Sequence, residues 1–203
     1  MTEYYASLLA APVRAAGRTT VEAPWDRVPI AEVDTTGEEG VEKALAIAWG
    51  LFRNRAAWLS VPRRMEILER AGRLVREQAE FLAMEAAREG GKPLVDSRVE
   101  VERAIDSLRL CADFLRTDEG EAVPMGLNAA SANRHAFTIA EPVGVVVAIS
   151  AFNHPLNLIA HQVGPAIAAG CPVIVKPAEE TPLSCWRLVR ILHEAGLPPE
   201  WCQ

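Results

Sequence analysis

One asparagine, Asn153, has a side chain and a position suited to stabilising negative charge on a substrate. It lies in the turn Phe152-Asn153-His154-Pro155, directly after an apolar run that predicts a strand. A side-chain amide donates hydrogen bonds without titrating, so it can stabilise a developing oxyanion. Ligands of open α/β sheets bind outside the carboxyl ends of the strands. From the residues alone, Asn153 could equally cap the helix predicted from Pro155, and both roles stay open.

The elements that must position this turn form a βαβα unit. Apolar, β-branched runs predict strands that are buried on both faces, and glycines end the two helices between and after them. The predicted order is a strand at 143–150, a helix at 155–169 ended by Gly170, a strand at 171–175 and a helix at 181–195 ended by Gly196. This alternation predicts parallel strands with right-handed crossovers.

The preceding residues have a different pattern. Apolar spacing predicts helices at 38–58, at 60–90 and at 95–116, two short β-like runs predict a hairpin at 121–140, and 1–38 is an irregular arm with a short strand near 19–21. Two parallel strands are too few to bury the faces of a doubly wound sheet, and the next strand is expected near residue 203. The fold class is therefore α/β: an incomplete Rossmann-like domain with N-terminal helices and a β-hairpin arm.

Composition narrows the class of protein. Half of the 203 residues are hydrophobic and 24% are charged, with a net charge of −6, which argues against binding to nucleic acid or anionic lipid. The N-terminus lacks the features of a signal peptide, and the longest apolar stretch, 143–151, is too short to span a bilayer. Four cysteines without paired spacing indicate neither disulfides nor a metal site. We expect a cytoplasmic protein.

An ordered set of segments within 141–203 resembles the aldehyde dehydrogenase superfamily. The segments are EPVGVV, the aromatic-Asn-x-Pro turn, GPAIAAG, VIVKPAEETPL and EAGLPPE. Each is weak alone, and their order and spacing carry the resemblance, which extends loosely back to about residue 38. The Phe152-Asn153 pair is most similar to the branch of lactaldehyde, phosphonoacetaldehyde and semialdehyde dehydrogenases. It differs from CoA-acylating aldehyde reductases and from glutamyl-phosphate reductase.

The resemblance implies NAD(P)-dependent oxidation of an aldehyde to a carboxylic acid. In this family, the asparagine matching Asn153 and a backbone N–H bind the aldehyde oxygen while a cysteine attacks the carbonyl carbon. Hydride then passes to NAD(P) and the thioester is hydrolysed. The residues that the resemblance assigns to the cofactor are Ile149, Ser150, Ala151 and Phe152 along its path and Lys176, Ala178 and Glu179 around the adenosine ribose. A carboxylate at Glu179 favours NAD, with NADP possible. No GxGxxG motif is present, and the family binds its cofactor without one.

Two functional groups of the family have no match in the sequence: the nucleophilic cysteine and the general-base glutamate. None of Cys111, Cys171, Cys185 and Cys202 has a basic partner that would make a reactive thiolate. Gln162 also departs from the lysine that many relatives use in a proton relay. We therefore predict that the chain alone is inactive. The alternative is a non-catalytic module, a truncation or split-gene product that binds a partner chain or a nucleotide.

Substrate and partners follow from the resemblance too. By the family's layout, Arg103 lies near the mouth of the substrate tunnel and Leu158 deeper inside. A guanidinium suits oxyanions, so Arg103 could hold an anionic tail of a short aldehyde. A surface arginine paired with Glu100 or Asp106 is the alternative. The resemblance divides the chain into helices and arm at 1–120, a bridging β-arm at 121–140 that pairs subunits into a homo-oligomer (dimer or tetramer), and the cofactor-binding unit at 141–203.

Overall fold

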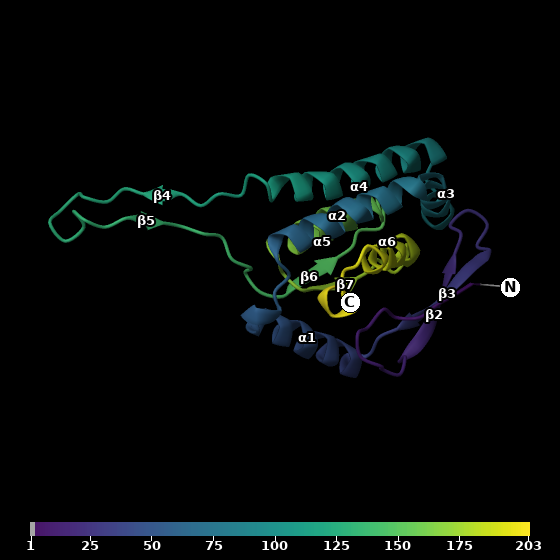
Figure 1. Ribbon diagram of the computed structural model, residues 1–203. Coiled ribbons are helices and arrows are strands. Elements are labelled where there is room, and N and C mark those ends of the chain that lie inside the picture. The colour runs from purple at the N-terminus through teal and green to yellow at the C-terminus, as the bar shows by residue number, and fades with distance from the viewer. Residues whose placement is uncertain (1–2) are drawn as a thin grey trace.

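The computed structural model covers residues 3–203 and has a helical body from which one long arm projects (Figure 1). The helices are α1 (Glu38–Arg53), η1 (Arg55–Ala57), α2 (Val61–Glu77), α3 (Ala79–Gly90), α4 (Leu94–Phe114), α5 (Asn157–Ala169), α6 (Pro182–Glu194) and η2 (Pro199–Trp201). The strands are β1 (Glu3–Tyr5), β2 (Gly17–Glu22), β3 (Pro29–Thr35), β4 (Ala122–Val123), β5 (Ala136–Phe137), β6 (Val146–Ile149) and β7 (Val173–Lys176).

The predicted βαβα unit is confirmed, with β6 and β7 paired in parallel from Val146↔Val173 to Ile149↔Lys176. The sheet continues on the other side of β7. There, Cys202 bridges to Val173 in parallel, and the backbone N–H of Val175 donates to the carbonyl oxygen of Gln203 at 2.8 Å. This contact lies where a further strand is expected, but an isolated bridge is not a strand, so the further strand stays a prediction.

The prediction that the first strand is buried on both faces is wrong. β6 is four residues long, and Val147 and Ile149 are 56% and 65% exposed, whereas Ala148 is buried. α5 packs against β6 on one face, but the described residues do not cover the face that carries Val147 and Ile149. The β-branched run is suited to a sheet covered on both sides.

Helices α2, α4, α5 and α6 pack together into the main hydrophobic core, in which Leu68, Leu108, Ile159 and Leu188 are fully buried. The helix predicted at 60–90 is two helices, because the backbone leaves helical geometry at Gln78 although the apolar spacing continues. Likewise, the helix predicted at 38–58 ends at Arg53, and a short 3₁₀ turn follows Asn54.

The N-terminal residues are more regular than predicted. They form a three-stranded sheet of order β1-β3-β2, in which β1 is parallel and β2 antiparallel to β3. Tyr5, Val21 and Ile30 pack from this sheet against Leu183 of α6. β3 was not predicted because Glu32 and Asp34, residue types depleted in strands, interrupt its apolar pattern.

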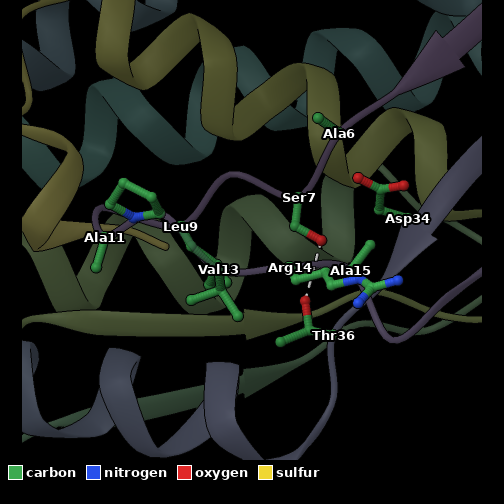
Figure 2. Close-up of a pocket in the computed structure, with 10 residues that line it drawn as sticks. Ala6, Ser7, Leu9, Ala11, Val13, Arg14, Ala15, Asp34 and Thr36 are labelled. Carbon is green, nitrogen blue, oxygen red and sulfur yellow. Dashed lines mark hydrogen bonds between the residues drawn. The ribbon is translucent and has the colours of Figure 1, made fainter.

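A pocket of about 150 Å³ lies under the N-terminal segment (Figure 2). Most of the residues between Ala6 and Ala15 line it together with Asp34 and Thr36, and the hydroxyls of Ser7 and Thr36 lie 3.0 Å apart. None of the predicted site residues lines this pocket. The pocket lies within the packing of the N-terminal residues and is separate from the candidate site.

The predicted hairpin at 121–140 is confirmed as strands β4 and β5, paired through Ala122↔Phe137 and Val123↔Ala136. It extends away from the helical body (Figure 1). Its apolar side chains are largely exposed: Leu127 is 82%, Phe137 75% and Ile139 69% accessible. The arm therefore presents apolar surface that no other described part of the chain covers.

Candidate active site

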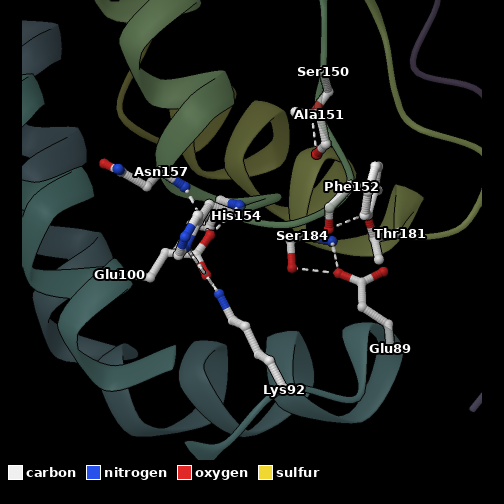
Figure 3. Close-up of polar contacts among 11 residues, drawn as sticks. Glu89, Lys92, Glu100, Ser150, Ala151, Phe152, His154, Asn157, Thr181 and Ser184 are labelled. Atoms are coloured by element: carbon white, nitrogen blue, oxygen red, sulfur yellow. Dashed lines mark hydrogen bonds and ion pairs between the residues drawn. The ribbon is translucent and has the colours of Figure 1, made fainter. Parts of the chain in front are cut away.

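The carboxyl ends of β6 and β7 meet at one edge of the sheet. Beyond the pair Ile149↔Lys176, the backbone N–H of Ser150 donates to the carbonyl oxygen of Lys176 at 2.9 Å. The turn after β6 (residues 150–156) and the loop after β7 (residues 177–181) therefore start side by side. The Thr181 hydroxyl donates to the carbonyl oxygen of Phe152 at 3.1 Å and joins the turn to the loop (Figure 3).

Asn153 is exposed in the turn, and its side-chain amide makes no hydrogen bond within residues 3–203. The alternative role as a helix cap is wrong. α5 begins at Asn157, and no local side chain caps it. A neutral donor thus faces solvent at the sheet edge where parallel α/β proteins bind ligands.

A buried glutamate from α4 caps α5 instead. The carboxylate of Glu100, 1% exposed, accepts hydrogen bonds from the backbone N–H groups of Leu156 at 2.7 Å and Asn157 at 3.0 Å (Figure 3). The other carboxylate oxygen of Glu100, Oε2, forms an ion pair with the Lys92 ammonium. The Nδ1 atom of His154 lies 3.8 Å from the same oxygen. Burial lowers the pKa of Lys92, while the charges of Asp96 and Glu89 oppose this shift.

A second buried glutamate acts in the same way on α6. Glu89, 2% exposed, accepts from the backbone N–H groups of Leu183 at 2.8 Å and Ser184 at 2.7 Å, and also from the Ser184 hydroxyl. Burial raises the pKa of Glu89, and these hydrogen bonds together with the charge of Arg187 oppose the rise. α5 follows the turn after β6, and α6 follows the loop after β7. The first turn of each of these helices therefore donates to a buried carboxylate from α3 or α4.

The residues expected to bind a cofactor lie along the same edge. The Lys176 ammonium is 3.5 Å from the Glu179 carboxylate, and both side chains are open to solvent, at 55% and 85% exposure. Ala178 between them is buried. On the β6 side, Ile149 and Phe152 are exposed, Ala151 is half-buried and Ser150 is buried. Sequence reasoning thus selected residues that the fold brings together.

Arg103 is exposed on α4, and Leu158 is half-buried on α5, which packs against α4. The alternative in which Arg103 pairs with Glu100 or Asp106 is wrong. Glu100 pairs with Lys92, and Asp106 lies 3.5 Å from the guanidinium of Arg109.

Burial first, and then the charges of Lys92 and Arg103, lower the pKa of His154. Arg103 therefore contributes positive potential at the turn that carries Asn153.

Gln162, which replaces the lysine of many relatives, has a contact of its own. Its side-chain amide donates to the carbonyl oxygen of Ile149 at 2.9 Å. It therefore fixes α5 to the end of β6, one turn of helix beyond Leu158.

Three of the four cysteines have a raised pKa. Burial raises the pKa of Cys111 to about 11 and that of Cys202 to about 12, and it raises the pKa of Cys185 further. Cys171, Cys185 and Cys202 are all buried. A nucleophilic thiol needs a lowered pKa and access to substrate, so these side chains are small core residues.

Glu89 and Glu100 were missed in the sequence because both lie in charged segments. The signal was the helical spacing: Glu100 shares a face with Ser97, Ala104 and Leu108, all of which are buried. A carboxylate on an otherwise apolar face must find hydrogen-bond donors inside the protein. The spacing alone could not identify those donors, because they lie on helices far along the chain.

Within residues 3–203, no group of three or more histidine, cysteine, aspartate or glutamate side chains could hold a metal ion. No helix in the same part of the chain is long and apolar enough to cross a membrane.

Comparison with known proteins adds to this geometry. The profile of the aldehyde dehydrogenase family matches residues 13–203. The chain belongs to the aldehyde dehydrogenase family. A 3-sulfolactaldehyde dehydrogenase from Priestia megaterium is 42% identical over 174 residues, which are 86% of this chain and 36% of that protein.

Two solved structures are similar to this chain. Aldehyde dehydrogenase 21 from Physcomitrella patens, in complex with the reaction product succinate, is 32% identical with a TM-score of 0.92, and the match covers 100% of this chain and 42% of that one. A glyceraldehyde-3-phosphate dehydrogenase from Methanocaldococcus jannaschii, complexed with NADP, is 32% identical with a TM-score of 0.84, covering 95% and 41%. The chain thus spans about two fifths of the length of these two enzymes, and its α/β fold is that of a partial Rossmann-like domain.

Proposed function

We propose that this chain forms the cofactor-binding and oxyanion-stabilising part of an enzyme that oxidises an aldehyde to a carboxylic acid with NAD(P). The observation that carries the proposal is the free amide of Asn153, exposed at the sheet edge beside Lys176 and Glu179. Asn153 donates to the aldehyde oxygen as negative charge develops on it. A neutral donor fixed in place is suited to this role because it needs no change of protonation.

The groups around Lys176 and Glu179 fit a dinucleotide. Both side chains are exposed and 3.5 Å apart at the carboxyl end of β7, and they present a cation and an acceptor to ribose hydroxyls. When bound, the nicotinamide accepts the hydride that leaves the substrate. A carboxylate at Glu179 accepts a hydrogen bond from a 2′-hydroxyl and repels a 2′-phosphate, which favours NAD. The similar enzyme complexed with NADP makes NADP the alternative.

The substrate we infer is a short aldehyde with an anionic tail. Arg103 is exposed, has no ion pair within residues 3–203 and adds positive potential near His154. The names of three similar proteins agree, since 3-sulfolactaldehyde, succinate and glyceraldehyde 3-phosphate are all anionic, whereas the lactaldehyde of another relative is neutral. Arg103→Ala should lower kcat/KM for anionic aldehydes and leave that for neutral ones of equal length unchanged. An unchanged selectivity would refute this assignment.

The nucleophile and the general base must come from outside these residues. Cys171, Cys185 and Cys202 are buried, and burial raises the pKa of Cys111, so none of the four thiols is suited to be the nucleophile. We therefore expect no turnover from the 203 residues alone, and only weak cofactor binding, since half of the cofactor crevice is present.

We also propose that the β4–β5 arm pairs subunits into a dimer or tetramer. The exposed side chains of Leu127, Phe137 and Ile139 would lose contact with water in such an assembly.

The deciding experiment is aldehyde-dependent formation of NADH by these 203 residues and by the complete product of the gene. Short anionic and neutral aldehydes serve as substrates, and Asn153→Ala is the matched control. Activity in the complete protein that depends on Asn153 supports the proposal. Cofactor binding without turnover in either protein would favour a non-catalytic module instead.

A further inference from the structure

Helix α5 starts directly after the turn that carries Asn153, and α6 starts directly after the loop that carries Glu179. Neither helix is capped by a side chain of its own. Their first free N–H groups donate instead to Glu100 and Glu89, which flank the corner between α3 and α4 (Figure 3). The contacts join residues that are 56 to 95 positions apart in the sequence. Each helix start is therefore fixed to another part of the fold.

A local cap was available and serves another purpose. Thr181 occupies the N-cap position of α6, where a hydroxyl usually accepts from the helix backbone. Its hydroxyl donates to the carbonyl oxygen of Phe152 and joins the turn to the loop. Buried carboxylates are unfavourable unless donors surround them, and a local threonine would satisfy the same N–H groups without that cost. The long-range carboxylates do what a local cap does not: they hold the first turn of each helix against a distant part of the fold.

The corner that carries both glutamates is tightly packed. Gly91 ends α3 with φ of 68°, and a Cβ atom there would lie 2.5 Å from the ring of Pro24. Lys92, 14% exposed, contacts Glu100 from the same corner. The two carboxylates therefore share one frame, and that frame holds both helix starts.

We propose that Glu100 and Glu89 are positioning residues for the two halves of the site. Glu100 fixes Leu156, three residues after Asn153, and so sets where the Asn153 amide points. Glu89 fixes Leu183, four residues after Glu179, and so sets the loop that carries Lys176 and Glu179. The inference rests on the proposed function, because it assigns Asn153 to the aldehyde and Glu179 to the cofactor.

Steady-state kinetics of the complete enzyme test the assignment. Glu100→Gln should lower kcat by about ten- to a hundredfold, the effect of a small misplacement of a reacting group, with the KM for NAD little changed. Glu89→Gln should raise the KM for NAD by about tenfold, the loss expected when a charged hydrogen bond that orders the loop is weakened, with kcat little changed. Glu102→Gln and Glu80→Gln, exposed on α4 and α3, are the matched controls.

A purely structural role would also lower activity, so double-mutant cycles separate the two. If Glu100 acts through Asn153, Glu100→Gln should have almost no further effect on kcat in an Asn153→Ala background. In a Glu179→Gln background, Glu89→Gln should likewise add little to the KM for NAD. Should a glutamine variant fail to fold, the aspartate variant, which keeps the charge and withdraws it by one methylene, enters the same cycle.

Additive losses in both cycles would overturn the inference, as would parallel changes of kcat and KM in both variants. An inactive wild-type enzyme would instead count against the proposed function, so the two failures are distinguishable.

Discussion

Replacing Asn153 with alanine separates catalysis from stability at one residue. The side chain is exposed, makes no hydrogen bond within residues 3–203 and does not cap α5. Its loss should change the free energy of unfolding by no more than about 0.5 kcal/mol, as for other exposed positions. A capping asparagine would cost about 1 kcal/mol or more. Loss of an oxyanion donor should lower kcat by about 10²–10³-fold, or about 2.7–4 kcal/mol in the activation barrier.

The assay pairs urea unfolding with steady-state oxidation of a short anionic aldehyde, on the complete enzyme and its Asn153→Ala variant. Asn153→Asp is the second variant. It keeps the size of the side chain but places a negative charge where the oxyanion forms, so it should be at least as slow as the alanine variant.

Two results would refute this reasoning. If alanine lowered stability by more than about 1 kcal/mol, Asn153 would have a structural role that the hydrogen bonds of α5 do not reveal. If alanine left kcat within about twofold of wild type, the amide would not be the oxyanion donor.

Three further predictions concern the titratable side chains of the site and of the core. Glu179→Gln should reduce the preference for NAD over NADP, measured as a ratio of kcat/KM values, by about tenfold as like-charge repulsion is removed; an unchanged ratio would contradict the cofactor assignment. Burial and the Lys92 ammonium lower the pKa of His154 below its ordinary value of 6.5. The unfolded protein therefore binds the proton more tightly, so the free energy of unfolding falls as pH drops below about 6.5 and is unaffected by His154 at higher pH. NMR titration should find this lowered pKa, and Lys92→Met should raise it. Cys185 and Cys202 should react with a thiol reagent only after unfolding, because burial raises the pKa of both, and rapid labelling of the native protein would contradict their burial.

The sequence predicted the elements that local patterns determine. Gly170 and Gly196 end α5 and α6 with positive φ, as their positions after apolar runs indicated, and the strand-turn-helix pattern placed Asn153 at a sheet edge. The pairing of β6 with β7 followed from the βαβ rule. These features depend on residues close together in the chain.

Features that depend on distant residues were not predicted. The break at Gln78 interrupts an apolar spacing that continues through it, and β3 is stabilised by pairing with β1 and β2 rather than by its own composition. The partners of Glu89 and Glu100 lie at least 56 positions away. The exposure of Ile149 reflects a sheet face that the described residues do not cover.

The long-range caps of α5 and α6 have a consequence for how the protein folds. α3 and α4 precede the βαβα unit in the chain, so during synthesis the α3–α4 corner emerges before the helices whose first turns it caps. Closing contacts over 56 to 95 residues costs chain entropy before they gain energy, so these contacts should form late. The two turns should therefore acquire their final geometry only at the last docking step, and mutations at Glu89 and Glu100 should speed unfolding more than they slow folding.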